Sequence, residues 1–237
     1  LVPEESDVFI IAVPTPFCKE KNSSGVPEPD LNYIKAAVKS IAPNLKAGDL
    51  VILESTSPVG TTEWISELLA EHRTDLSFPQ MSGDESDIRI AYCPERVLPG
   101  NILKELVTND RVIGGLTDKC SDKTVTLYKN FVSGKCFTTN SRTAEMSKLT
   151  ENSCRDVQIA FANELSVICD DLDINVWELI TLSNKHPRID ILKPGPGVGG
   201  HCIAVDPWFI VNNNPDKAKL IQTARLVNDE QPNEVTN

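Results

Sequence analysis

Several kinds of segment are missing from this sequence of 237 residues. Its longest apolar run, residues 8–13, is far shorter than the ~20 residues that a membrane-spanning helix needs. Lys and Arg number 23 against 34 Asp and Glu and form no basic cluster, so the net charge of −11 argues against a nucleic-acid partner. The first residues show neither the basic region nor the apolar core of a signal peptide. We therefore expect neither a membrane nor a nucleic-acid partner.

The cysteines lack the patterns of disulfide and zinc proteins. The seven cysteines include no CxxC pair, and an odd number at irregular spacing is unlike a disulfide framework. No Cys or His pair has the spacing of a zinc site, so no metal is expected. A reducing cytoplasm is the expected location, and all cysteines except Cys202 are expected to pack as small hydrophobes.

The first part of the chain alternates strands with helices, in a composition that is 40% apolar and 24% charged, as in globular proteins. Such alternation predicts a parallel sheet with right-handed crossovers. Strands are expected at 7–13, 50–53, 88–92, 111–113 and 136–138, helices at 31–45, 61–72 and 118–131, and a loop at 19–29.

The pattern changes at Ser141, after which about thirty residues carry neither Pro nor Gly and place apolar residues at helical spacing. A helix of ~30 residues would be ~45 Å long and is typical of a dimer or interdomain spine. Further helices are expected at 175–184, 206–211 and 216–229, with a loop at 187–201. We expect a domain boundary near residue 140, which divides the chain into 1–140 and 141–237.

A glycine-rich segment, 195–202, contains the pattern G-x-G-x-x-G. A dinucleotide-binding fingerprint needs a preceding strand, whereas this segment follows a helix and two prolines, Pro187 and Pro194. Two interpretations remain open. Glycines can let backbone amides approach an anion and expose the Cys202 thiol, or the segment is a flexible connector that ends in a buried cysteine.

Cys202 and Asp206 form the first candidate pair. If a helix begins near Cys202, Asp206 lies one turn further on the same face, and the helix dipole favours the thiolate. The carboxylate could then move protons or activate water. His201 is the rival base, although neighbouring residues on a helix point apart.

Lys148, Asn152 and Arg155 share one face of the long helix at spacings i, i+4 and i+7. A cation beside a neutral donor can stabilise an oxyanion. The alternative is a solvated face on which Glu145 and Glu151 pair with these cations.

Three loops follow predicted strands: 14–16, 55–60 and 92–96. In open parallel sheets, ligands bind beyond the carboxyl ends of the strands. These loops are therefore candidate ligand contacts.

Taken together, the strings at 7–16, 54–60, 91–100 and 199–209 resemble the UDP-glucose/GDP-mannose dehydrogenase family, in particular its branch acting on UDP-N-acetyl-D-mannosamine. The resemblance implies an NAD-dependent, four-electron oxidation of the C6 alcohol of a UDP-sugar to a carboxylate. It implies an α/β fold, with the later half of a Rossmann-like, NAD-binding sheet (1–140) followed by an all-α central domain with a long spine helix (141–237). A homodimer through that helix is also implied.

The same resemblance implies roles for individual residues. Cys202 matches the nucleophile that forms a thiohemiacetal and then a thioester. Lys148 and Asn152 match the groups that stabilise the oxyanion and handle the proton, Asp206 the carboxylate that assists hydrolysis, and Glu95 the acid near the thioester and its water.

Ligand contacts are implied as well. Thr15 and Thr56 match cofactor contacts, and Thr62 in the following helix is a further candidate. Arg188 matches a position that can reach across a dimer. The residues at sugar and diphosphate positions are Arg96, Val97, Lys148, Asn152, Arg155, His186, Arg188 and Gly199.

Two departures from the family pattern stand out. Pro99 occupies the place of a second Glu in many relatives, and nothing matches the glycine fingerprint or the C-terminal UDP-binding domain. We therefore expect a piece of a longer enzyme, inactive alone. The alternatives are a non-catalytic helical dimerisation module, a thiol hydrolase using Cys202 with His201, or a 6-dehydrogenase of another UDP-sugar such as UDP-N-acetylglucosamine or UDP-glucose.

Overall fold

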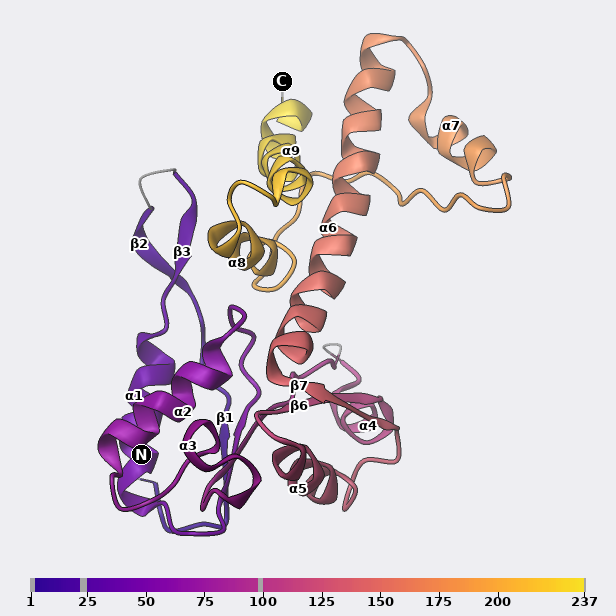
Figure 1. Ribbon diagram of the computed structural model, residues 1–237. Coiled ribbons are helices and arrows are strands. Elements are labelled where there is room, and N and C mark those ends of the chain that lie inside the picture. The colour runs from indigo at the N-terminus through magenta and orange to yellow at the C-terminus, as the bar shows by residue number, and fades with distance from the viewer. Residues whose placement is uncertain (1–2, 22–24, 98–99, 237) are drawn as a thin grey trace. The chain divides into compact units, whose positions relative to one another are not determined.

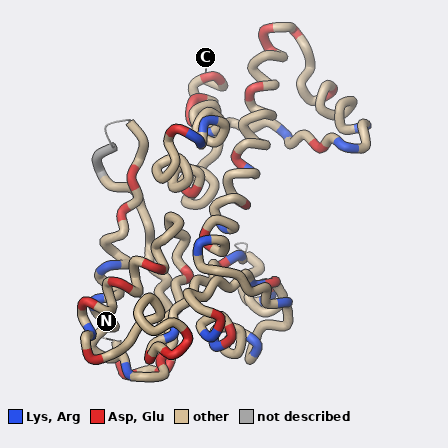
Figure 2. Tube along the Cα trace, in the orientation of Figure 1, with Lys and Arg blue, Asp and Glu red and all other residues tan. Residues whose placement is uncertain are grey.

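In the computed structural model, which describes residues 3–21, 25–97 and 100–236, contacts group the chain into two units. The first contains Leu1–Cys18 and Pro29–Lys148, and the second contains Lys19–Glu28 and Leu149–Asn237. Figure 2 shows Asp and Glu spread over both units, with Lys and Arg among them. Within the described ranges, no helix has the length and apolar character that a membrane crossing requires.

The first unit is built on a mixed sheet with strand order β1-β4-β5-β6-β7. The strands are β1 (Val8–Ile11), β4 (Leu50–Leu53), β5 (Arg89–Tyr92), β6 (Arg111–Gly115) and β7 (Cys136–Asn140). Neighbours run parallel except β5 and β6, which pair antiparallel through Ala91↔Gly115 and Tyr92↔Gly114. The predicted α/β class is confirmed, but the prediction of an all-parallel sheet is wrong at this pair.

The link between β5 and β6 accounts for the change of direction. It contains one described helix, α4 (Ile102–Thr108), in which no residue is buried. A parallel crossover packs the apolar face of a helix on the sheet, whereas the apolar side chains of α4, such as Leu103 (82% exposed), stay exposed.

Helices cover both faces of the inner strand β4, in which every residue is buried. Val51 and Leu53 pack with α1 (Asn32–Ile41) and α2 (Thr61–His72) in one apolar cluster. Leu50 and Ile52 pack with α5 (Asp118–Tyr128) in another. Because successive side chains of a strand point to opposite faces, a continuous apolar run is what such a strand needs.

Some elements differ from the sequence-based expectation. Helix α1 ends at Ile41 and a 3₁₀ turn, Ala42–Asn44, follows it around Pro43. Helix α3 (Pro79–Ser82) and a 3₁₀ turn at Gly83–Glu85 were not predicted. The expected loop at 19–29 is wrong in part, because β2 (Phe17–Lys21) and β3 (Pro27–Pro29) pair as a separate sheet.

The long helix α6 (Ser141–Asp171) confirms the predicted spine, and it starts in the first unit and continues in the second. The second unit adds α7 (Val176–Ser183), α8 (Asp206–Asn213) and α9 (Lys219–Thr236) (Figure 1). A buried ion pair joins α9 to α6, with Arg225 Nη1 2.5 Å from Asp156 Oδ1 and both side chains 0% exposed.

Candidate active site

The loops after β1 and β4 meet at one end of the parallel strands. The Thr15 hydroxyl donates to the Thr56 carbonyl at 2.6 Å, and Ser55 Oγ accepts from the Val13 N–H at 2.8 Å. Thr15 and Thr56 are half-buried, so both remain within reach of a ligand. In the same loop, Ser57 Oγ is buried and has no hydrogen-bond partner within the described residues.

Thr62, the third predicted cofactor contact, is buried and engaged by Glu145. Its hydroxyl donates to Glu145 Oε1 at 2.6 Å and its N–H donates to the same oxygen at 2.8 Å. The Gly60 N–H donates to Oε2 at 2.7 Å. Burial raises the pKa of Glu145, and these hydrogen bonds oppose that shift. The alternative that Glu145 pairs with cations of its own helix face is therefore wrong.

The loop after β5 is held by Lys148, whose Nζ donates to the Glu95 carbonyl oxygen at 2.9 Å. The exposed Glu95 carboxylate accepts from the Val97 N–H. The Arg96 carbonyl accepts from Asn109 Nδ2 at 3.2 Å. Four predicted site residues of the first unit thus lie together. Pro99, the departure from the family pattern, lies outside the described residues.

Cys202 is exposed and lies in a turn, not at the first residue of a helix. The Asp206 N–H donates to the Cys202 carbonyl at 2.9 Å, which confirms that the two residues are one turn apart. The condition of a helix that begins near Cys202 is not met, and α8 begins at Asp206, as the predicted helix at 206–211 does, with Pro207 in its first turn, a position that proline favours. The alternative of a buried cysteine at the end of a connector is wrong.

Asn152 connects the long helix to this turn. Its Nδ2 donates to Asp206 Oδ2 at 2.6 Å, and Asp206 is only 3% exposed. A buried carboxylate, oriented by an amide, therefore lies one turn from an exposed thiol. In this arrangement the Asp206 carboxylate can accept a proton from a water molecule that lies beside a group bound to the Cys202 sulfur.

The other predicted ligand contacts of the second unit are exposed. Arg155 lies on α6, while His186 and Arg188 follow α7, where the Arg188 N–H donates to His186 Nδ1 at 3.4 Å. Gly199 and His201 lie in the exposed end of the glycine-rich segment.

The start of that segment is anchored by residues that sequence reasoning did not single out. The Gly195 N–H donates to Asn163 Oδ1 at 2.9 Å, and Asn163 Nδ2 donates to Asn228 Oδ1 at 2.9 Å. Gly197 has φ +117 and lies against the Pro232 ring, where a Cβ would meet Cγ at 3.1 Å. Both asparagines, on α6 and α9, are buried, and a buried amide must find partners, but their burial is known only from the structure.

Cysteine packing follows the expectation only in part. Cys93, Cys120 and Cys169 are buried, and burial raises the pKa of Cys93 to about 12. Cys18 and Cys154 are exposed, so the expectation that they pack as small hydrophobes is wrong. Within the described part of the chain, no three His, Cys, Asp or Glu side chains gather as metal ligands.

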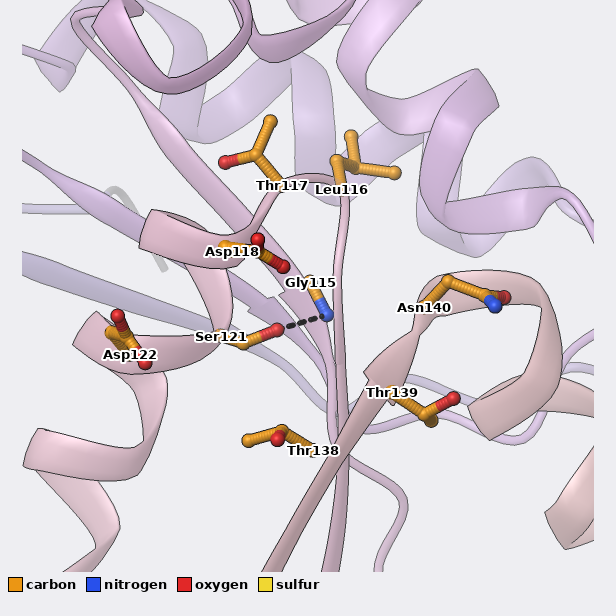
Figure 3. Close-up of a pocket in the computed structure, with 9 residues that line it drawn as sticks. All are labelled: Gly115, Leu116, Thr117, Asp118, Ser121, Asp122, Thr138, Thr139 and Asn140. Atoms are coloured by element: carbon orange, nitrogen blue, oxygen red, sulfur yellow. Dashed lines mark hydrogen bonds between the residues drawn. The ribbon is translucent and has the colours of Figure 1, made fainter.

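A cavity of about 480 Å³ lies away from the predicted site residues, between the start of α5 and the ends of β6 and β7 (Figure 3). In it, Ser121 Oγ accepts from the Gly115 N–H at 3.0 Å. The lining is polar and consists of Gly115, Leu116, Thr117, Asp118, Ser121, Asp122, Thr138, Thr139 and Asn140.

Two family models match almost the whole chain. Residues 2–132 match the NAD binding domain of the UDP-glucose/GDP-mannose dehydrogenase family, and residues 142–230 match its central domain. The chain belongs to this family. The resemblance predicted from the sequence is thereby confirmed.

Similar members of the family include named enzymes. The UDP-N-acetyl-D-mannosamine dehydrogenase of Campylobacter jejuni is 66% identical over 98% of this chain and 56% of its own length. The NDP-N-acetyl-D-galactosaminuronic acid dehydrogenase of Ralstonia solanacearum is 64% identical over 98% of this chain and 54% of its own length. The chain thus spans about half the length of these relatives.

Among solved structures, a UDP-D-ManNAc dehydrogenase of Pyrococcus horikoshii is 43% identical, with a TM-score of 0.87. The alignment covers 98% of this chain and 52% of that one. The UDP-N-acetyl-mannosamine dehydrogenase Cap5O of Staphylococcus aureus is 48% identical, with a TM-score of 0.84.

Proposed function

We propose that the protein containing this chain oxidises the C6 alcohol of UDP-N-acetyl-D-mannosamine to the uronate, with two equivalents of NAD and one water. The observation that carries the proposal is the exposed Cys202 one turn before a buried Asp206 that accepts from Asn152. The substrate is supported by the names of relatives about 65% identical to the chain.

The donor set of the first unit fits NAD. Thr15 and Thr56 lie at the carboxyl ends of adjacent parallel strands, where α/β sheets bind nucleotides, and Ser57 offers a hydroxyl without a partner within the described residues. NAD, when bound, accepts a hydride in each of the two oxidations. Thr15 and Thr56 would hold it.

The remaining steps belong to the chain's own side chains. The Cys202 thiolate bonds to C6 of the sugar, first as a thiohemiacetal and then as a thioester. Lys148 and Asn152 stabilise the negative oxygen on C6. Asp206 takes a proton from the water that cleaves the thioester, which releases the uronate and restores the thiolate. Glu95 orients that water.

Recognition of the sugar nucleotide is assigned to exposed residues. Arg96, Arg155 and Arg188 supply positive charge for the diphosphate in a chain whose net charge is −11. Val97, His186 and Gly199 contact the sugar. A second substrate candidate is an N-acetylgalactosamine derivative, because the Ralstonia solanacearum relative is named for that sugar acid.

The same proposal covers assembly and location. We infer a homodimer through α6, supported by exposed apolar side chains such as Phe161 (53%) and Ile168 (44%). We also infer a cytoplasmic enzyme with functional domains that divide near residue 140. Because the chain spans about half the length of its relatives, the piece alone is expected to be inactive.

The experiment follows NADH formation from UDP-N-acetyl-D-mannosamine by the full-length protein. We expect two NADH per sugar, and we expect Cys202→Ser to lose uronate formation, because a serine hydroxyl is far less acidic than a thiol. Cys154→Ser is the matched control, since Cys154 is also exposed but has no proposed role. Wild-type uronate production by Cys202→Ser would exclude the covalent route.

A further inference from the structure

Glu145 is a buried carboxylate that the proposed reaction does not use. It lies in the first turns of α6, is 0% exposed, and binds the start of α2. The N-cap of α2 is Gly60, which has φ +100 and no side chain to cap the helix. Glu145 performs that task from 85 residues away, because its two oxygens accept from the Gly60 and Thr62 N–H groups. A negative charge at this end of a helix also suits the helix dipole.

The loop in front of α2 is the one that carries the cofactor contacts. Thr56 lies in it and holds Thr15 through its carbonyl oxygen. Ser55 in the same loop binds the backbone of Val13. Fixing Gly60 and Thr62 therefore fixes the end of the Thr56 loop, and with it the pair of half-buried threonines.

The same end of α6 also carries a proposed catalytic residue, Lys148. Lys148 lies three residues after Glu145, a spacing that puts both side chains on one side of α6. Lys148 binds the Glu95 carbonyl, in the loop after β5, at 2.9 Å. The first turns of α6 thus hold the loops that follow two neighbouring strands, β4 and β5.

We propose that Glu145 is a positioning residue, which sets the Thr56 loop for NAD and keeps that loop in register with Lys148. This inference rests on the proposed function. Burial leaves no water to replace the carboxylate, so removing its charge leaves the donors of Gly60 and Thr62 poorly paired. The loop then loses its defined position, and NAD binds more weakly.

The test compares two neutral variants of the full-length protein. Glu145→Gln keeps the shape and removes the charge. Glu63→Gln is the matched control, because Glu63 also joins α2 to α6, but its carboxylate accepts from the exposed Arg142, at 2.8 and 2.5 Å, and not from the Gly60 and Thr62 N–H groups that Glu145 holds. The dissociation constant of NADH is measured by fluorescence titration, and that of NAD by its competition with NADH. The KM of each substrate, kcat and Tm are measured alongside.

We expect Glu145→Gln to weaken NAD binding at least tenfold and to lower kcat, with the KM of the UDP-sugar unchanged within about twofold. Glu63→Gln is expected to leave NAD binding unchanged. If Glu145→Gln does not fold, Glu145→Asp keeps the charge and shortens the reach, and it is expected to show the same selective loss for NAD to a smaller degree.

Wild-type NAD affinity in Glu145→Gln would overturn the inference. An equal loss of affinity for NAD and for the UDP-sugar, in proportion to a lower Tm, would overturn it as well. Failure of the proposed function has a different signature. The wild-type protein would then bind NADH but form none from the UDP-sugar, and the binding comparison between variants would still test Glu145.

Discussion

The ammonium group of Lys148 binds a backbone carbonyl of the Glu95 loop, although it lies on a helix face that could have been merely solvated. Lysine and asparagine one turn apart were expected to act together, and the structure gives each a partner of its own. Lys148 holds the loop of Glu95, and Asn152 holds Asp206. The catalytic roles of both residues stay predictions.

Lys148→Ala in the full-length enzyme is expected to slow turnover by roughly 10²–10³, because an oxyanion donor contributes about 2.7–4 kcal/mol to the transition state. Steady-state kinetics and a denaturation curve measure the two effects separately. Lys129→Ala, at an exposed lysine that follows α5, should change stability by less than about 0.5 kcal/mol and leave the rate unaltered. A Lys148→Ala enzyme as fast as the control would remove Lys148 from the mechanism.

The buried pair Asp156–Arg225 yields a stability prediction. Asp156→Ala leaves a guanidinium that is 0% exposed with one fewer anion, so we expect a loss of about 3–5 kcal/mol in the free energy of unfolding. Urea denaturation measures it. Asp229→Asn is the control, since Asp229 contacts the same arginine but is 51% exposed, and less than about 1 kcal/mol is expected. Equal losses in the two variants would contradict this account.

The family resemblance found residues with distant partners, such as Asn152 and Asp206, 54 residues apart, but reasoning from spacing alone found only local pairs. The turn from Cys202 to Asp206 follows from spacing alone. Glu145 binds Thr62 from 83 residues away, and Asn163 binds Gly195 from 32 away. No periodicity in the chain encodes such pairs, because they depend on how finished elements pack.

At the scale of elements, the positions of β4, α2 and α6 followed closely from the sequence. An apolar run marks β4, and a stretch without Pro or Gly marks α6. Strand direction did not follow, because the antiparallel pairing of β5 with β6 depends on a connection without a buried helix face. The pairing of β2 with β3 was missed because neither strand alternates apolar with polar residues.

The packing of β6 against the start of α6 gives a prediction for this scale. A Cβ at Gly114 would lie 2.6 Å from Ala144 Cβ and 2.6 Å from the Asn140 carbonyl oxygen. Gly114→Ala should therefore cost about 1–3 kcal/mol, measured by thermal or urea unfolding. Gly195→Ala is the control, because a Cβ there meets nothing within 4 Å. A neutral Gly114→Ala would mean that the strand and the helix can separate without cost.

At the scale of the whole molecule, apolar side chains remain exposed along the second unit. Phe161 and Ile168 on α6 are 53% and 44% exposed, and Trp177 on α7 is 55% exposed. Side chains of this kind are enriched in the cores of protein interfaces. They support the proposed homodimer.

Phe161→Glu in the full-length protein is expected to weaken dimerisation at least tenfold, because it places a charge in a desolvated interface. Sedimentation velocity over a concentration series measures this. Leu220→Glu on α9, at a side chain that is 69% exposed, should leave the assembly unchanged. A wild-type protein that sediments as a monomer at micromolar concentration would refute the dimer.

The division of the chain into units was not foreseen in full. Contacts separate the units between Lys148 and Leu149, within α6, and they assign Lys19–Glu28 to the second unit. A single boundary near residue 140 does not account for the assignment of Lys19–Glu28 to the second unit. As a boundary of functional domains, residue 140 stays a prediction.

The assignment of Lys19–Glu28 to the second unit has a consequence for the order of folding during synthesis. The ribosome releases Lys19–Glu28 early, whereas the rest of the second unit begins at Leu149. The amide of Asn212, which donates to the Pro27 carbonyl at 3.4 Å, is made 185 residues after its acceptor. The first unit can therefore fold once Lys148 has left the exit tunnel, while the second must wait for the residues from Leu149 onward and then close the long loop between Glu28 and Leu149. If the chain folds from the N-terminus onward, Lys19–Glu28 is the last segment before Lys148 to reach its native structure.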